Sequence, residues 1–294
     1  MHHIADLIFE PGLFGSSAVR TAAVVGAVVA MVSGPIGVFT VVRGQSFAGH
    51  ALSDVATTGG SGAFLVGVSP LLGYVALGVV AAGAMDLIGI ERARGRDVAT
   101  GIVLGAGLGL SALFLYFDTT LHSTTGATMT ILFGSMFAIA GSTVPMVVTF
   151  SAIAVGIVVL LYRPLLLSSV SMEVAAARGV PVRLVGLLYL LGLSMAVALS
   201  AVTIGAILST GLLIGPAATA LRVTKRPGLA MLGAGLIGVA AVWLGIVLAY
   251  DSFYWPPRGH GWPVSFFVVT LIFLFYLLGR LPGRRTLAAG PGVA

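Results

Sequence analysis

Two residues four positions apart, His50 and Asp54, are the side chains of this sequence best suited to bind a cation. On an α-helix, residues at this spacing lie on one face with Cβ atoms about 6 Å apart, so both can reach one divalent ion. Thr57 and Thr58 continue the polar face. A structural interpretation competes with this one: Asp54 accepts a hydrogen bond from His50, and the pair pins its helix to the neighbours. Two ligands are also fewer than the four to six that a first-row divalent ion takes, so a metal site would need ligands from other segments.

The pair lies in a strongly apolar chain. Of 294 residues, 58% are hydrophobic and 8% are charged, and the mean hydropathy is +1.12. Soluble domains carry about 25% charged residues, so this composition excludes a soluble globular protein and predicts a multi-pass protein of the cell membrane. An ionisable residue in mid-membrane costs at least about 2.5 to 3.5 kcal/mol on insertion scales, so it needs a partner or a water-filled cavity. The chain has no Cys, so any metal chemistry must use His, Asp, Glu, Met or backbone oxygen.

The elements that must position the pair are transmembrane helices. A span needs about 20 mostly apolar residues. Windows of that length predict an all-α, polytopic bundle of about nine transmembrane helices (8 to 10), at 18–42, 47–67, 70–89, 98–117, 141–162, 182–202, 204–222, 229–250 and 263–280. The apolar piece 129–141 is too short to cross and is expected to be re-entrant or interfacial.

The basic residues predict the orientation of these spans. With the N-terminus outside and the C-terminus in the cytoplasm, all but Arg20 and Arg258 of the 15 basic residues fall in cytoplasmic segments, as the positive-inside rule requires. The chain then divides into an extracytoplasmic segment 1–17, a transmembrane domain 18–280 and a disordered cytoplasmic tail 281–294. Because the basic residues separate apolar segments rather than cluster on a solvated face, no nucleic-acid partner is expected.

Glycine is abundant, with 41 residues, and this favours close helix packing. Gly101, Gly105 and Gly109 are spaced four apart, so they share one helical face. We expect a neighbouring backbone to approach that face closely, without any particular function.

The connection 165–182 differs from the other cytoplasmic segments. Residues 172–179 hold helix formers, with Glu173 early, Arg178 late and Gly179 as a terminator. Ser168, Ser169 and Ser171 are available as caps. The pattern predicts a short helix outside the membrane, at about 170–180, on which a partner could dock.

Taken together, these segments resemble the permease subunits of ABC importers for zinc and manganese, the ABC-3 transport proteins. The resemblance extends from about residue 18 to 280 and rests on four stretches: 43–54, 96–102, 173–182 and Ile204-Gly205 through Pro216-Ala217-Ala218-Thr219-Ala220, the last being the most specific. The first departs from the family in one respect. Where the family usually has Asp-Ala-Leu-Ser-His, this chain has His50-Ala51-Leu52-Ser53-Asp54, so acid and imidazole have exchanged positions.

The resemblance implies a permease that forms the translocation path for zinc or manganese, with His50 and Asp54 as transient metal ligands and no permanently bound cofactor. It implies cytoplasmic ATP-binding subunits as partners, an extracytoplasmic metal-binding protein, and a homodimer in the membrane. It also implies that Glu173, Ala175, Arg178 and Gly179 belong to the coupling helix that fits the ATPase.

The chain itself holds no Gly-x-x-x-x-Gly-Lys-Ser/Thr loop, so it is expected to be no enzyme, with ATP hydrolysed by a partner. An alternative is a secondary transporter that uses His50 and Asp54 as a proton or cation relay. An intramembrane serine protease is a weaker alternative, because Ser209-Thr210-Gly211 lacks the Gly-x-Ser-x-Gly elbow.

Overall fold

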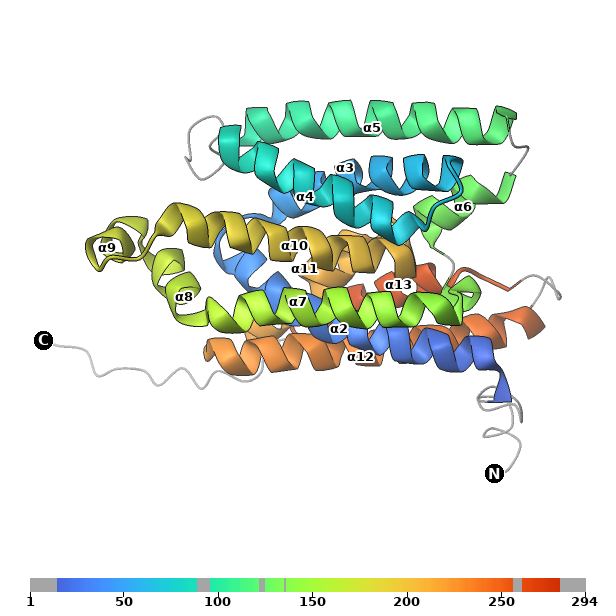
Figure 1. Ribbon diagram of the computed structural model, residues 1–294. Helices are drawn as coiled ribbons and strands as arrows, with labels where there is room; N and C mark the ends of the chain where they lie inside the picture. Colours follow the sequence, from blue (N-terminus) through green and yellow to red (C-terminus); the bar gives the residue numbers. More distant parts are fainter. Residues whose placement is uncertain (1–14, 89–95, 122–124, 135, 256–260, 281–294) are drawn as a thin grey trace, which may run out of the picture.

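A computed structural model describes residues 15–88, 96–121, 125–134, 136–255 and 261–280, and within these ranges the chain forms helices and turns but no strand. The all-α prediction is therefore confirmed. The helices, most of them running side by side along one bundle (Figure 1), are α2 Ser17–Val42, α3 Ser46–Leu65, α4 Pro70–Ile88, α5 Arg96–Leu121, α6 Thr125–Phe133, α7 Val144–Leu160, α8 Tyr162–Val170, α9 Met172–Ala177, α10 Val182–Ile204, α11 Ser209–Val223, α12 Pro227–Asp251 and α13 Val264–Leu278, with short 3₁₀ turns at Met136–Ala138, Gly141–Thr143 and Ser252–Tyr254.

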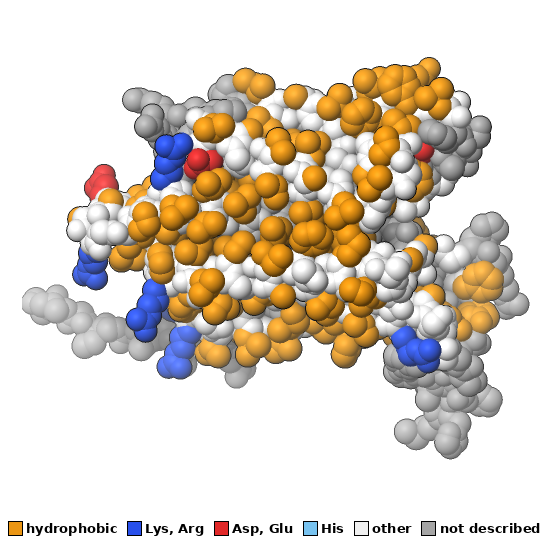
Figure 2. Space-filling model, viewed as in Figure 1, with side chains coloured by type: hydrophobic (Ala, Val, Ile, Leu, Met, Phe, Trp, Pro, Cys, Tyr) orange, Lys and Arg blue, Asp and Glu red, His pale blue; other side chains and the backbone are white. Residues whose placement is uncertain are grey.

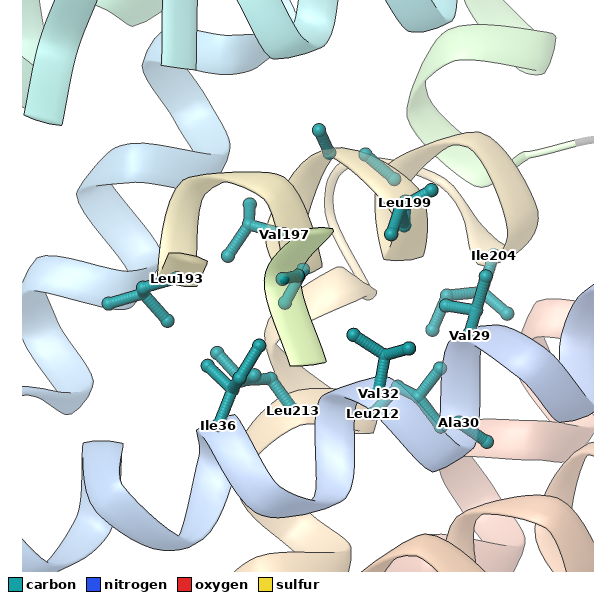
Figure 3. Packing of buried hydrophobic residues seen from close by; sticks show 14 of the residues in the cluster. Val29, Ala30, Val32, Ile36, Leu193, Val197, Leu199, Ile204, Leu212 and Leu213 are labelled. Carbon is teal, nitrogen blue, oxygen red and sulfur yellow. The ribbon is translucent and has the colours of Figure 1, made fainter. Parts of the chain in front are cut away.

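The core forms where α2 meets α10, α11, α12 and α7. Helices that are apolar on all sides are buried in a bundle or face lipid. Both cases occur here: 72% of the most apolar window of α10 is buried, against 22% for α5. Figure 3 shows the interdigitated aliphatic side chains of α2, α10 and α11, which include Val29, Val32, Ile36, Leu193, Val197 and Leu212.

Glycines set the closest helix contacts. A Cβ at Gly34 of α2 would collide with the backbone of Gly235 of α12, and a Cβ at Gly59 of α3 would collide with the backbone of Gly73 of α4. The prediction that a neighbouring backbone approaches Gly101, Gly105 and Gly109 is wrong. Among the described residues, a Cβ at any of the three would meet nothing within 4 Å. On α5 the packing face is instead the one that carries Gly107, where a Cβ would press on Val55 of α3.

Each of the nine expected windows contains a helix, but only six stretches of the described chain are both long and apolar enough to cross a membrane. These correspond to α2, α4, α5, α7, α10 and α12. Helices α11 and α13 have 15 residues each, about 22 Å at 1.5 Å per residue, against a hydrocarbon core of about 30 Å. Helix α3 has 20 residues, and polar side chains of His, Asp, Ser and Thr lower its hydropathy.

A helix interruption joins α10 to α11 in the interior of the bundle. Helix α10 ends at Ile204, and its cap residue Gly205 has a φ of +87°, in the region that favours glycine. The freed N–H groups of Ala206 and Ile207 donate to the carbonyls of Ile131 (3.1 Å) and Leu132 (3.2 Å) near the end of α6. Short helix α6 thus ends against the break instead of continuing as a span. Backbone that leaves the helix at membrane depth requires such partners, because no water replaces them.

Candidate functional site

The imidazole of His50 and the carboxylate of Asp54 face each other on α3. His50 Nε2 lies 3.6 Å from Asp54 Oδ2, which is longer than an N–H···O hydrogen bond. The two side chains are exposed to different degrees: 46% of the His50 side chain is accessible, against 11% for Asp54. The pair therefore has a buried acidic member and an open imidazole.

The other polar side chains of α3 are used within the bundle. Thr57 donates to the carbonyl of Ser53 (2.8 Å), and Thr58 donates to the carbonyl of Gly107 on α5 (2.7 Å). Ser61 donates to the carbonyls of Thr57 and Thr58. Thr57 and Thr58, expected to extend the polar face of the pair, thus serve helix geometry and packing.

Ser53, between the two members of the pair, fastens α3 to the α10–α11 break. Its hydroxyl lies 2.6 Å from the Ser209 hydroxyl and 3.0 Å from the carbonyl of Ala206. Ser209 also donates to the same carbonyl, at 2.8 Å. The contact between these two serines could not be predicted, because residues 156 positions apart form no local sequence pattern. The only local signal was the interruption of the apolar run before Ser209, which indicated a break.

Within the described residues no group of three or more His, Cys, Asp or Glu side chains comes close enough to hold a metal ion. His50 and Asp54 thus form an imidazole–carboxylate pair that no third acidic or imidazole side chain of the described residues joins. His122 and His260, the histidines of two polar loops, lie outside the described residues.

The segment with Glu173, Ala175, Arg178 and Gly179 forms α9, at one end of the bundle (Figure 1). Ser171 is the cap, because its Oγ accepts the N–H of Val174 (3.2 Å), whereas Ser168 and Ser169 donate to the carbonyl of Leu165. Ala175 is fully buried, and Glu173, Arg178 and Gly179 are exposed.

The end of α9 is a tight turn at Gly179. The N–H of Gly179 donates to Ala176 (2.9 Å) and the N–H of Val180 donates to Ala175 (3.0 Å), the two bonds of a Schellman motif. Gly179 has a φ of +80°, which side chains with a Cβ rarely adopt. The turn directs the chain at once into α10.

Asp86, at the end of α4, binds Arg183 at the start of α10, with Oδ2 and Nη2 3.5 Å apart. This pair joins α4 to the beginning of α10 close to α9. The next basic residues along the chain, Arg92 and Arg94, lie outside the described residues.

In the described residues, a helical bundle with six membrane-length helices and a buried carboxylate beside an imidazole is typical of multi-pass membrane proteins that conduct or transport ions. The chain belongs to the ABC 3 transport family, whose model matches residues 16–279.

Relatives with known names agree with this membership. The chain is 30% identical over 245 residues to the manganese transport system membrane protein MntC of Halalkalibacterium halodurans, covering 83% of each chain. It is 28% identical over 244 residues to the manganese import system permease protein ScaB of Streptococcus pneumoniae, covering 83% of this chain and 85% of the relative. It is 27% identical over 229 residues to the high-affinity zinc uptake system membrane protein ZnuB of Haemophilus influenzae, covering 77% and 87%.

A solved structure shares the fold. The chain superposes with a TM-score of 0.79 and 25% identity on PsaBC from Streptococcus pneumoniae in complex with Fab, covering 94% of this chain and 95% of the other. The whole helical domain is thus common to both chains.

Proposed function

We propose that this chain is the membrane-spanning subunit of an ATP-driven importer for zinc or manganese, and that His50 and Asp54 form part of its translocation path. The observation that carries the proposal is the pair itself, an imidazole and a mostly buried carboxylate 3.6 Å apart in a member of this family.

The geometry of the pair suits a shared ion. Two ligand atoms each about 2.1 Å from one ion lie about 3.0 Å apart at a right angle and about 3.4 Å apart at the tetrahedral angle. The observed 3.6 Å separation requires only a slight closure. A site with few protein ligands also releases its ion easily, as conduction requires.

The missing ligands are proposed to come from a second copy of the chain. The described residues supply no third acidic or imidazole ligand, and His50 keeps 46% of its side chain accessible. A homodimer that apposes two α3 helices would bring two such pairs together and offer four ligands, which is the number that zinc commonly takes.

The proposed topology has nine spans, with the N-terminus outside and the C-terminus in the cytoplasm. Helices α3, α11 and α13 would be three further spans beside the six membrane-length stretches. Each of the three lies in the same bundle and packs against helices of that set. In Figure 2 most of the Lys and Arg side chains in view gather at the end that carries α9, which favours that end as the cytoplasmic one.

Helix α9 is proposed to receive a cytoplasmic ATP-binding subunit. Met172 and Val174 expose 40% and 48% of their surface beside the charged Glu173 and Arg178, a mixture suited to docking. Ala175 anchors the helix, and the turn at Gly179 connects it to α10. An extracytoplasmic metal-binding protein would deliver the ion, and no cofactor stays bound to this chain.

The pair leaves zinc and manganese open, because imidazole suits zinc whereas carboxylate and water suit manganese. The test is uptake of radiolabelled Zn²⁺ and Mn²⁺ by cells that express this chain with its ATP-binding subunit. We expect uptake of one of the two metals to stop when ATP is depleted and to persist when an ionophore collapses the proton gradient.

The opposite dependence would overturn the proposal in favour of a secondary transporter, in which His50 and Asp54 relay protons or cations. Reading frames beside this one that encode an ATPase and a metal-binding protein would support the importer before any uptake is measured.

A further inference from the structure

Arg43 joins three helices at the α9 end of the bundle. It follows α2 directly, as the residue that caps the helix. Its Nη1 donates to Ser168 Oγ of α8 at 2.9 Å, and its guanidinium carbon lies 5.3 Å from the ring centroid of Tyr189 on α10. One half-buried side chain thus contacts the helix before α9 and the helix after it.

The partners of Arg43 are themselves held in place. The Tyr189 hydroxyl lies 2.7 Å from the Thr40 hydroxyl of α2, and Thr40 donates to the carbonyl of Ile36 at 2.8 Å. Thr40, Tyr189 and Ser168 are all buried. Arg43 therefore binds a preorganised polar cluster, not a solvated surface.

Helix α8 is attached to α2 at a second point. Tyr162, the first residue of α8, packs edge-on against Phe39 of α2, with ring centroids 6.3 Å apart. Together with the bond from Arg43 to Ser168, this contact fixes both the beginning and the later turns of α8 on α2. A displacement of α8 must then be passed to the end of α2.

On one side the connection continues into α9. Ser171 is the only residue between α8 and α9: its N–H donates to Leu167 (3.1 Å), and its carbonyl accepts from Ala175 (3.1 Å). Because the single residue Ser171 both ends α8 and caps α9, α8 and α9 are expected to move together.

On the other side it continues into α3. The N–H of Gly44 donates to Val41 (3.1 Å) and the N–H of Gln45 donates to Thr40 (2.9 Å), which closes α2 in a Schellman turn. The carbonyl of Gln45 then accepts from Gly49 (3.0 Å) in the first turn of α3. His50 is the next residue, so the tight turn and the first turn of α3 separate Arg43 from the candidate metal ligands.

We infer that Arg43 is a positioning residue that links movement of α9 to the orientation of His50 and Asp54, through Ser168 and Tyr189. This inference rests on the proposed function, since it assigns a route to the coupling proposed there. The guanidinium suits this task because it stays charged, donates in fixed directions and stacks on an aromatic ring at the same time. Lysine has one compact charge and cannot form both contacts with the same geometry.

The test uses the full chain co-expressed with its ATP-binding subunit and measures metal taken up per ATP hydrolysed. Arg43→Lys and Ser168→Ala are compared with Ser169→Ala, a matched control whose hydroxyl, among the described residues, donates within α8 to Leu165 (2.6 Å). Coupling free energies of 1 to 3 kcal/mol correspond to about 5- to 150-fold. We therefore expect the ratio to fall about fivefold or more in the first two variants and to stay at the wild-type value in Ser169→Ala.

A double variant tests whether Arg43 and Ser168 act through their shared contact or have two independent structural roles. If Arg43 and Ser168 act as one link, Arg43→Lys with Ser168→Ala lowers the ratio no further than either change alone. The inference would be overturned if the effects of the two single changes multiply in the double variant, or if Arg43→Lys keeps the wild-type ratio. It would also be overturned if uptake falls only because less ATPase co-purifies, while the ratio of metal to ATP stays unchanged. Failure of the proposed function is distinct, because it appears in the wild type as uptake that does not need ATP.

Discussion

Two polar regions adjoin each other along α3, and they differ in how their groups are partnered. Around Ser53, the hydroxyls of Ser53 and Ser209, the carbonyl of Ala206 and the N–H groups of Ala206 and Ile207 have partners in the chain. His50 and Asp54, on either side of Ser53, are 3.6 Å apart, and the imidazole is open. Polar groups that hold a fold together at membrane depth satisfy one another. Polar groups that remain accessible can still bind a ligand, so they suit an ion that binds transiently.

The largest expected effect concerns the open pair. Asp54→Ala should lower metal uptake at least about tenfold, because even the indirect partners of a metal ligand are worth 10- to 100-fold in affinity or activity. His50→Ala should act in the same direction. The measurement is initial uptake of labelled metal at matched protein levels.

The control for this change lies on the same helix. Ser61→Ala removes a hydroxyl that, among the described residues, donates to carbonyls of its own helix α3, so uptake should stay near the wild-type value. Wild-type uptake in both His50→Ala and Asp54→Ala would make the pair structural and remove the contrast with the region around Ser53.

The second effect concerns the region around Ser53 and the helix break, and the quantity expected to change is the free energy of unfolding. Gly205→Ala should destabilise the protein by about 1 to 3 kcal/mol, because a Cβ is strained at a φ of +87° and would collide with the backbone of Leu132 and Phe133. The melting temperature of the purified protein measures this.

Gly105→Ala is the matched control, since a Cβ there meets nothing within 4 Å and alanine favours a helix. Its melting temperature should equal or exceed that of the wild type. Equal melting temperatures for Gly205→Ala and Gly105→Ala would mean that the helix break does not contribute to stability.

A smaller effect is expected at Ser53, in the centre of the region whose polar groups are partnered. Ser53→Ala removes the bonds to Ser209 and Ala206 and should cost about 0.6 kcal/mol, the average for side-chain hydrogen bonds between membrane helices. Ser151→Ala provides the comparison, because the buried Ser151 hydroxyl has no hydrogen-bond partner in the described chain. A larger loss in Ser151→Ala than in Ser53→Ala would contradict the assignment of Ser53 to structure.

The smallest change in uptake is expected when His50 and Asp54 exchange positions. The double variant His50→Asp with Asp54→His keeps both ligand types on one face and restores the order that is usual in the family, so it should retain most of the wild-type uptake. Each single replacement alone should lose it. If the double variant is as inactive as the single ones, the order of acid and imidazole matters to the site more than their joint presence.

Composition and periodicity were sufficient to predict the helical class, the approximate helix ranges and the candidate pair. The apolar windows gave a helix at each expected place, since a chain in lipid must satisfy its backbone within each segment. The spacing of His50 and Asp54 placed them on one face, because four residues make about one turn. These features depend on neighbours in sequence.

Packing contradicted one expectation that was local in origin and showed how two other side chains are used. The spacing of Gly101, Gly105 and Gly109 is ideal for close approach, yet Gly107 carries the contact, because the spacing cannot indicate which face of α5 meets α3. Thr57 and Thr58 share the polar character of the pair, yet their hydroxyls bond to carbonyls of α3 and α5.

By itself, the sequence determined that this is a multi-pass helical protein, because its composition is apolar and its charged residues are few. It also determined that one imidazole and one carboxylate lie on the same face of a helix, because they are four residues apart. Only the tertiary structure decided which polar groups are already satisfied and which remain open. It joined Ser53 to Ser209 and Arg43 to Ser168, across 156 and 125 residues. The physical reason is that hydrogen-bond satisfaction depends on partners that only helix packing brings within 3 Å or so.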